Sequence, residues 1–274
     1  MSTDWLPWYG AHLFCFEVHG LDGVDDRGRS KPSKKLTESR ASGRSPEGSP
    51  DAKTVRWFRK QLLKWGQTHR RDFPWRRSRD PYGIFVAECL LQKTEANHAL
   101  PVYRAFMARY PTLAALGDAS LEELSALLEP LGLRFRAPRL LDAARSILEN
   151  EAHGGQLPDC ETELLKLPGV GRYTARSILS QAFDRPLAVL DTNIARILER
   201  FFGVEGGRVK SRDALLWSLA QEVAPKREMG VWNLTLIDFG AAVCTAQKPR
   251  CSECILLKRC NFGELRVESL DFRG

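Results

Sequence analysis

Four cysteines near the end of the chain place the strongest constraint on its fold. They are separated by six, two and five residues and fall within seventeen: Cys244, Cys251, Cys254 and Cys260. The total of seven cysteines is odd, which does not suit the paired disulfide framework of a small secreted domain. Four thiolates this close can enclose zinc or a four-iron cluster, and thiolate chemistry alone favours zinc somewhat, because Cys-x-x-Cys pairs are common in zinc sites. The spacing therefore predicts a metal-stabilised loop.

The chain before this loop has the pattern of amphipathic helices. From Thr54 onward apolar residues recur at three- and four-residue spacings, first as Val55, Phe58, Leu62 and Trp65. Similar stripes cover residues 84–92, 121–133, 138–149, 172–183, 193–202 and 213–223. Short polar segments separate them, and we expect loops at residues 80–83, 117–120 and 153–159. No alternating run of useful length predicts a strand, so an all-α fold is expected.

The first part of the chain has a different composition. Residues 27–50 are half Gly, Pro and Ser and contain almost nothing to bury, so we expect residues 1–53 to form a flexible extension. No run approaches eighteen apolar residues, and the N-terminus lacks the basic region of a signal peptide. We therefore expect no membrane association and a cytoplasmic location.

The net charge of +7 is concentrated beyond this extension. Residues 1–53 hold eight Lys or Arg and eight Asp or Glu, which leaves 33 and 26 of the totals of 41 and 34 for the rest. The excess positive charge suggests a polyanionic partner such as nucleic acid, although simple solubility explains it equally well.

A glycine-containing turn joins two apolar helical segments within residues 163–183. Gly169 and Gly171 permit positive φ angles and close backbone approach. A turn of this kind at a helix N-terminus presents unpaired N–H groups that can bind a DNA phosphate, and Arg172 lies beside them. Such turns also occur for packing reasons alone.

Asp191 follows about twenty residues later, where an apolar extended stretch meets a helix. Its simplest role is to cap that helix. Thr192 and Asn193 can also cap, so the Asp191 carboxylate is left available to face a cleft beside the hairpin.

Taken together, the hairpin, the delayed aspartate and the cysteine loop resemble the helix-hairpin-helix DNA glycosylase superfamily. The similarity is to the MutY adenine glycosylase and archaeal thymine-DNA mismatch glycosylase branch, and it rests on residues 71–76, 80–94, 167–175, 190–193 and 238–244 together with the cysteine loop. The cysteine spacing resembles the [4Fe-4S] loop of endonuclease III. The resemblance implies a helical domain over residues 80–185 that contains the hairpin, and a discontinuous iron-sulfur domain over 54–79 plus 186–274.

The resemblance also implies catalytic roles. Glu88 and Asp191 match the family's catalytic carboxylates, and breaking an N-glycosidic bond needs both a proton for the departing base and a negative charge beside the sugar. Tyr173 stands where the bifunctional relatives carry a lysine that forms a Schiff base. A phenol cannot do this, so a monofunctional hydrolase without β-lyase activity is expected.

The segments that probe the opposite strand in this family differ from those of the adenine enzymes. Here they carry Lys93 and, at the second site, Arg134 with Phe135. Basic residues at the first site, and a chain that ends fourteen residues after Cys260, resemble the thymine branch. We therefore expect a monomer that removes thymine or uracil opposite guanine from mismatched double-stranded DNA and is associated with the nucleoid. The alternatives are adenine removal opposite guanine or 8-oxoguanine, and a non-catalytic DNA-binding protein on the same scaffold.

Overall fold

The computed structural model describes residues 50–263, so most of the expected N-terminal extension lies outside the described residues. Within that range helices form and no β-strand does, which confirms the all-α expectation. The α-helices are α1 (Ala52–His69), α2 (Pro74–Arg77), α3 (Pro81–Leu91), α4 (Ala96–Arg109), α5 (Leu113–Gly117), α6 (Leu121–Leu128), α7 (Ala137–Glu149), α8 (Glu161–Leu164), α9 (Arg172–Ala182), α10 (Thr192–Phe202), α11 (Ala214–Val223) and α12 (Met229–Ala242). No helix in this part of the chain is long and apolar enough to cross a membrane.

The start of α3 corrects one expectation. Residues 80–83 are not a loop, because Pro81 opens the helix and the Asp80 side chain accepts hydrogen bonds from the backbone N–H groups of Tyr82 and Gly83. Proline suits the first turn of a helix, since its fixed φ matches the helix and its missing N–H would have no partner there. The Asp-Pro pair is thus a helix start.

The helix expected over residues 121–133 is also shorter than predicted. The regular α-helix α6 ends at Leu128, and a short 3-10 turn follows over Glu129–Leu131 with a proline in its first turn. Gly132 then adopts a positive φ of 66°, a conformation that glycine accepts without strain. A second 3-10 turn over Arg134–Arg136 then leads directly into α7.

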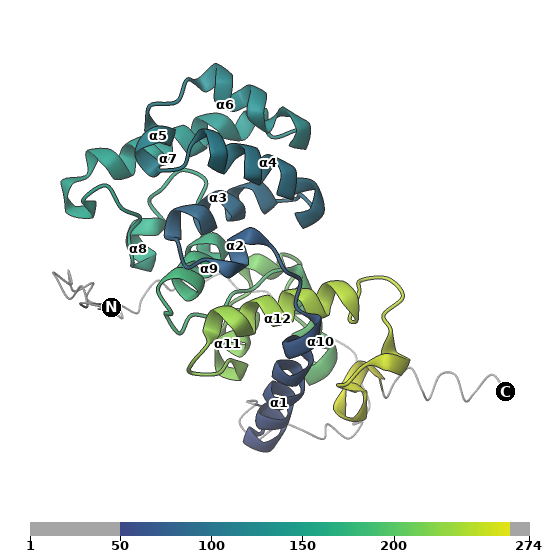
Figure 1. Ribbon diagram of the computed structural model, residues 1–274. Coiled ribbons are helices and arrows are strands. Elements are labelled where there is room, and N and C mark those ends of the chain that lie inside the picture. Colours follow the sequence, from purple (N-terminus) through teal and green to yellow (C-terminus); the bar gives the residue numbers. More distant parts are fainter. Residues whose placement is uncertain (1–49, 264–274) are drawn as a thin grey trace, which may run out of the picture. The chain divides into compact units, whose positions relative to one another are not determined.

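The first hydrophobic core surrounds α3. Nine of the eleven residues of α3 are buried, and α4, α6, α7 and α9 are among the helices that contribute to the rest of this core. Figure 1 shows α4 to α7 gathered beside α3. A helix that is apolar all round is stable only when neighbours cover every face. A polar side chain on α3 is therefore surrounded by buried apolar residues of the neighbouring helices.

The second hydrophobic core surrounds α12, and α1, α10 and α11 pack against it or each other (Figure 1). Trp232 and Phe239 of α12 are almost fully buried there. Helix α9 contacts both α3 and α12 and so joins the two cores. The expected domain boundaries stay a prediction. Phe73 and Trp75 belong to the first core, although they precede residue 80, where the domain with the hairpin was expected to begin.

Candidate active site

Glu88 is a buried carboxyl group on α3. It is 7% exposed, and its Oε1 accepts a hydrogen bond from the Ser177 hydroxyl at 2.6 Å and a longer one from the Gln181 amide at 3.4 Å. Burial raises the pKa of Glu88 and the charge of Asp191 raises it further, while the two hydrogen bonds and Arg76 oppose the shift. The side chain is thus biased to keep its proton at a higher pH than an ordinary glutamate.

Asp191 is the N-cap of α10. This corrects the expectation that Thr192 or Asn193 could cap the helix in its place. Its Oδ1 accepts a hydrogen bond from the Ile194 N–H at 2.7 Å, and its Oδ2 accepts one from the Asn193 amide at 2.9 Å. Burial raises the pKa of Asp191, whereas these donors and Arg196 lower it. The helix N-terminus also favours a negative charge at this place. Capping therefore fixes the carboxylate and helps it to stay ionised.

The segment before Asp191 is held by one buried amide. The Val189 N–H donates to Asn233 Oδ1 at 3.2 Å, and Asn233 Nδ2 donates to the Leu187 carbonyl at 3.0 Å and to the Ser180 hydroxyl at 3.1 Å. These bonds give the extended backbone the partners that a sheet would otherwise supply. Asn233 thereby sets where the chain enters α10, and with it the position of Asp191.

Tyr173 completes the expected catalytic group. It lies in the first turn of α9, and burial raises its pKa well above the ordinary value, with further increases from the charges of Glu88 and Asp191. The charges of both carboxyl groups thus act on the phenol, while Arg76 and a hydrogen bond with Ser177 lower its pKa. The phenol stays neutral there and can donate a hydrogen bond.

A fourth side chain at this site, Arg76, was not singled out from the sequence. Its charge lowers the pKa of both Glu88 and Tyr173. Two hydrogen bonds at 2.7 and 3.1 Å join its guanidinium to Asp238 of α12. Arg76 ends the segment 71–76 that resembles the glycosylase family, and that resemblance is the sequence signal that points to it.

The hairpin turn lies between α8 and α9. Gly169 has a φ of +82°, and Gly171 precedes α9 without a side chain to cap it. The first N–H groups of a helix have no partner inside the helix, so this end suits a phosphate. Arg172 does not extend freely from it. Its guanidinium lies 4.3 Å from the centre of the Trp217 ring and 3.7 Å from Glu161.

Two neighbouring loops carry the other expected DNA contacts. Lys93 is exposed and has a φ of +60°, and the preceding residue, Gln92, donates from its side chain to the Gly169 carbonyl at 3.3 Å. The loop therefore lies beside the hairpin turn. A positive φ is unusual for a lysine and marks a sharp change of chain direction after α3.

The second of these loops is tied to the end of α3 by Arg136, which donates to the Cys89 carbonyl at 3.0 Å. Arg134 is exposed and pairs with Glu129 at 2.6 Å, and Phe135 is 63% exposed. Lys93, Arg134 and the hairpin turn thus gather near the C-terminal end of α3.

The four cysteines of the C-terminal loop are free and partly buried. Burial raises the pKa of Cys254 to about 11, and the other three thiols of the loop raise it as well. Cys244, Cys254 and Cys260 pack against the second core. Among residues 50–263 no three Cys, His, Asp or Glu side chains are close enough to hold a single metal ion. Four neighbouring free thiols in one loop are nonetheless the donor set that a [4Fe-4S] cluster requires.

A chain of hydrogen bonds connects this loop with Asp191. Asn193, which donates to Asp191, accepts from Arg196 Nη2 at 2.7 Å. Arg196 Nε in turn donates to the Cys244 carbonyl at 2.7 Å, and its Nη2 also donates to the Gly240 carbonyl at 2.8 Å. The start of the cysteine loop and the N-terminus of α10 are therefore held in one network.

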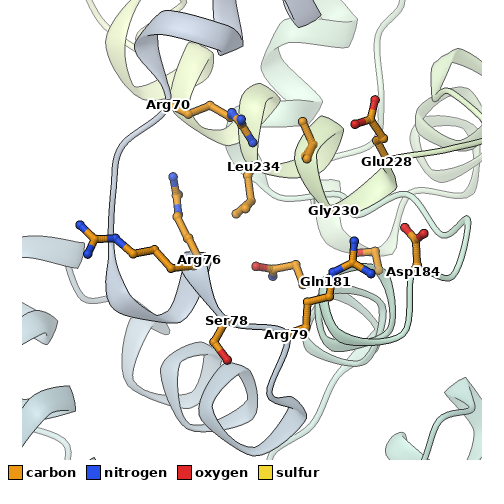
Figure 2. A pocket seen from close by; sticks show the side chains of 12 residues that line it. Arg70, Arg76, Ser78, Arg79, Gln181, Asp184, Glu228, Gly230 and Leu234 are labelled. Atoms are coloured by element: carbon orange, nitrogen blue, oxygen red, sulfur yellow. The ribbon is translucent and has the colours of Figure 1, made fainter. Parts of the chain in front are cut away.

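A pocket of about 210 Å³ adjoins the site. Figure 2 shows several of its charged side chains, and the charged residues that line it are Arg70, Arg76, Arg77, Arg79, Asp184 and Glu228. Gln181 lines it too, and the same amide reaches Glu88. The pocket is thus an opening between α2, α9 and α12, with Gln181 between it and Glu88.

The chain is similar to several known DNA glycosylases. A thymine/uracil-DNA glycosylase of Methanothermobacter thermautotrophicus is 34% identical over 76% of this chain and 93% of its own. The human adenine DNA glycosylase is 38% identical over 80% of this chain and 41% of its own. A solved structure of a thermostable thymine-DNA glycosylase, 34% identical, matches with a TM-score of 0.73 over 78% of this chain and 98% of that one.

The match to a family model includes both Glu88 and the hairpin. Residues 86–222 match the model of the HhH-GPD superfamily base excision DNA repair protein. That range also includes Tyr173 and Asp191, the side chains that the fold brings together. The chain belongs to the HhH-GPD superfamily of base excision DNA repair proteins.

Proposed function

We propose that the protein is a DNA glycosylase that hydrolyses the N-glycosidic bond of a mispaired base. The observation that carries this proposal is the convergence of Glu88, Tyr173 and Asp191 beside the hairpin. A protein that only binds DNA has little use for two carboxylates here, because they repel phosphate. The superfamily and the glycosylase relatives support the same activity.

The two carboxyl groups suit the two charges that develop as the bond breaks. The electron pair of the bond leaves with the base, and a protonated Glu88 supplies the proton that neutralises it. The sugar becomes positively charged, and the ionised Asp191 stabilises that charge. Water then adds to the sugar carbon and loses a proton. The nucleotide must leave the duplex before this reaction, and a mispaired base does so at lower cost.

Tyr173 supports a hydrolysis without strand cleavage. A β-lyase step needs an amine that attacks the sugar, and a neutral phenol close to both carboxylates cannot form that Schiff base. The test is gel analysis of a labelled T:G duplex with and without alkali. We expect cut strands only after alkali; cut strands without it would show that the protein is bifunctional.

We favour thymine or uracil opposite guanine as the target. Three thymine or thymine/uracil-DNA glycosylases are 34 to 38% identical and are covered over at least 88% of their length. The identity of 38% with the human adenine DNA glycosylase keeps adenine as the second candidate. Single-turnover release from T:G, U:G, A:G and A:8-oxoguanine duplexes decides between them, since only one pair of substrates should release its base.

The partner that we propose is double-stranded DNA with a mismatch, bound by a protein monomer. The hairpin turn would hold a phosphate through its backbone N–H groups, and Lys93 would add a positive charge next to it. Phe135 is exposed at a neighbouring loop and suits stacking between bases. Arg134 would contact DNA after leaving Glu129.

We further propose that Cys244, Cys251, Cys254 and Cys260 hold a [4Fe-4S] cluster. When bound, such a cluster would cross-link the loop and fix its place against the second core. The position of the loop would then be linked to that of Asp191 by hydrogen bonds, because Arg196 ties the Cys244 carbonyl to the network around Asp191. The extra stabilisation would belong to the expected domain of residues 54–79 plus 186–274.

A further inference from the structure

Two side chains of α9, one helical turn apart, reach the same oxygen atom of Glu88. The Ser177 hydroxyl lies 2.6 Å from Oε1, and the Gln181 amide nitrogen lies 3.4 Å from it. Ser177 is 2% exposed, so its hydroxyl has almost no access to water. Neither residue was among those predicted from the sequence.

The two side chains also contact each other, and this sets the direction of the hydrogen bonds. Gln181 Nε2 donates to Ser177 Oγ at 2.8 Å. A hydroxyl has a single proton, and the 2.6 Å contact assigns that proton to Glu88 Oε1, while Oγ accepts from the amide and can also accept from the neutral Tyr173 phenol, which hydrogen-bonds to Ser177. Oε1 therefore accepts from two donors and is the carbonyl-like oxygen of the acid.

The second oxygen of Glu88 is in a different situation. Within the part of the chain that the structure describes, no hydrogen bond ends on Oε2, and this atom is not among the buried polar atoms that lack a partner. It therefore keeps some access to open space. When Glu88 is neutral, the proton is most stable on the oxygen that is not already accepting hydrogen bonds, which is Oε2.

We propose that Ser177 and Gln181 are positioning residues that hold Glu88 Oε1 as an acceptor and so direct the transferable proton to Oε2. This inference rests on the proposed glycosylase function. General acid catalysis depends on geometry first, because the proton must lie within hydrogen-bond reach of the leaving atom. A glutamic acid that could place its proton on either oxygen would spend part of its time in the wrong orientation.

Other groups also act on Glu88 and stay in place in the test. They are Arg76 from α2, Tyr173 from α9, Asp191 at the start of α10, and Cys89 from α3 itself. Removing the Ser177 hydroxyl takes away its hydrogen bonds with Glu88 and Gln181 and the one that lowers the pKa of Tyr173. Because the hydrogen bond with Glu88 lowers the pKa of that carboxyl group, its loss raises the pKa.

The experiment measures single-turnover base release from a T:G, U:G, A:G or A:8-oxoguanine duplex, whichever the wild type processes, as a function of pH. For Ser177→Ala we expect a roughly tenfold lower maximal rate and an alkaline limb that moves to higher pH. Ser177→Thr, which restores a hydroxyl, should return the limb toward its original position. A merely structural role would lower the rate equally at every pH.

The matched control is Ser180→Ala. Ser180 is on the same helix and equally buried, but its hydroxyl bonds to the Ser177 carbonyl and accepts from Asn233 rather than contacting Glu88. We expect its pH profile to keep the wild-type shape. Equal shifts in the two alanine variants would overturn the proposal.

Gln181→Leu provides a second test if Ser177→Ala does not fold, because Gln181 lines the pocket of Figure 2 and is only partly buried. It should shift the limb in the same direction and by less, since its contact with Oε1 is longer. A wild type that releases base, with unchanged profiles in Ser177→Ala and Gln181→Leu, would refute the positioning role alone. A wild type that releases no base from any of the four duplexes would refute the proposed function instead.

Discussion

Arg76 and Asp238 form a buried ion pair, with Nη1 of the arginine 2.7 Å from Oδ2 of the aspartate. The Asp238 side chain is 1% exposed and that of Arg76 10%. Asp238 also accepts two hydrogen bonds from Arg71, one from its backbone N–H at 2.9 Å and one from Nε at 2.7 Å. The pair therefore connects the segment before α3 with α12 and places the charge of Arg76 next to Glu88.

Replacing Asp238 should destabilise the fold. In Asp238→Asn the buried Arg76 loses its counter-charge, and breaking one partner of a buried pair costs about 3 kcal/mol in the free energy of unfolding. Urea unfolding followed by circular dichroism measures it. Asp72→Asn, which removes the exposed partner of Arg77, is the control and should leave the midpoint almost unchanged. Equal losses in both variants would show that burial of the pair is unimportant.

The same pair should make stability depend on pH. Burial alone would raise the pKa of Asp238, but the hydrogen bonds and charge of Arg76, with help from Arg71, bring it below its usual range. The folded-state pKa is thus lower than that of the unfolded chain, which is about 3.9. The contribution is complete above that value and disappears as the pH falls through the folded-state pKa. Asp238→Asn should flatten this acid limb of the unfolding curve.

Base release should decline on the alkaline side because Glu88 must be protonated. The raised pKa of Glu88 keeps the acid form present to a higher pH than for an ordinary glutamate. Glu88→Gln cannot donate the proton as an acid and should lower single-turnover release by roughly 10²- to 10⁴-fold. The alkaline decline should vanish with it. An intact decline in Glu88→Gln would assign the titration to another group.

The two hairpin glycines should respond differently to alanine. Gly169 has a positive φ, so Gly169→Ala should cost about 1 kcal/mol in the free energy of unfolding. A Cβ on Gly171 meets no atom within 4 Å and its φ is negative, so Gly171→Ala should fold normally. It should nevertheless weaken DNA binding in a fluorescence anisotropy titration, because the methyl group stands where a phosphate would approach. Unchanged binding would place the phosphate elsewhere.

Removing one cysteine of the loop should remove the cluster. Cys254→Ser should lose bound iron and visible absorbance, and its melting temperature should fall because the loop packs on the second core. Cys160→Ser, a free cysteine outside the loop, should keep both. Purified wild type that is colourless and contains zinc instead of iron would contradict the cluster assignment.

The helices with clear apolar stripes could be predicted from the sequence, and α9, α10 and α11 begin and end within one or two residues of expectation. Helix α4 contains Pro101 in its interior, which hides the pattern. Helix α12 is buried on nearly every side and includes buried polar residues, so it has little amphipathic stripe to detect. Its place between other helices is a property of the tertiary fold.

The site divides in the same way. The resemblance named Glu88, Tyr173 and Asp191 because they lie in recognisable segments of the chain, and their catalytic roles stay predictions. Ser177 and Gln181 could not, since a serine and a glutamine four residues apart on a helix are ordinary until α3 packs against that helix. Asp191 caps α10 and is also a candidate site residue. A capping role found from the sequence therefore does not exclude a second role for the same side chain.

The most direct test of the account compares wild type with Asp191→Asn on a T:G duplex. Asparagine keeps the capping geometry but carries no negative charge to stabilise the sugar. We predict that wild type releases free thymine in a single turnover, and that Asp191→Asn releases none on the same timescale while binding the duplex with similar affinity. Thymine release by Asp191→Asn at the wild-type rate would contradict the assignment of Asp191 and of the reaction built on it.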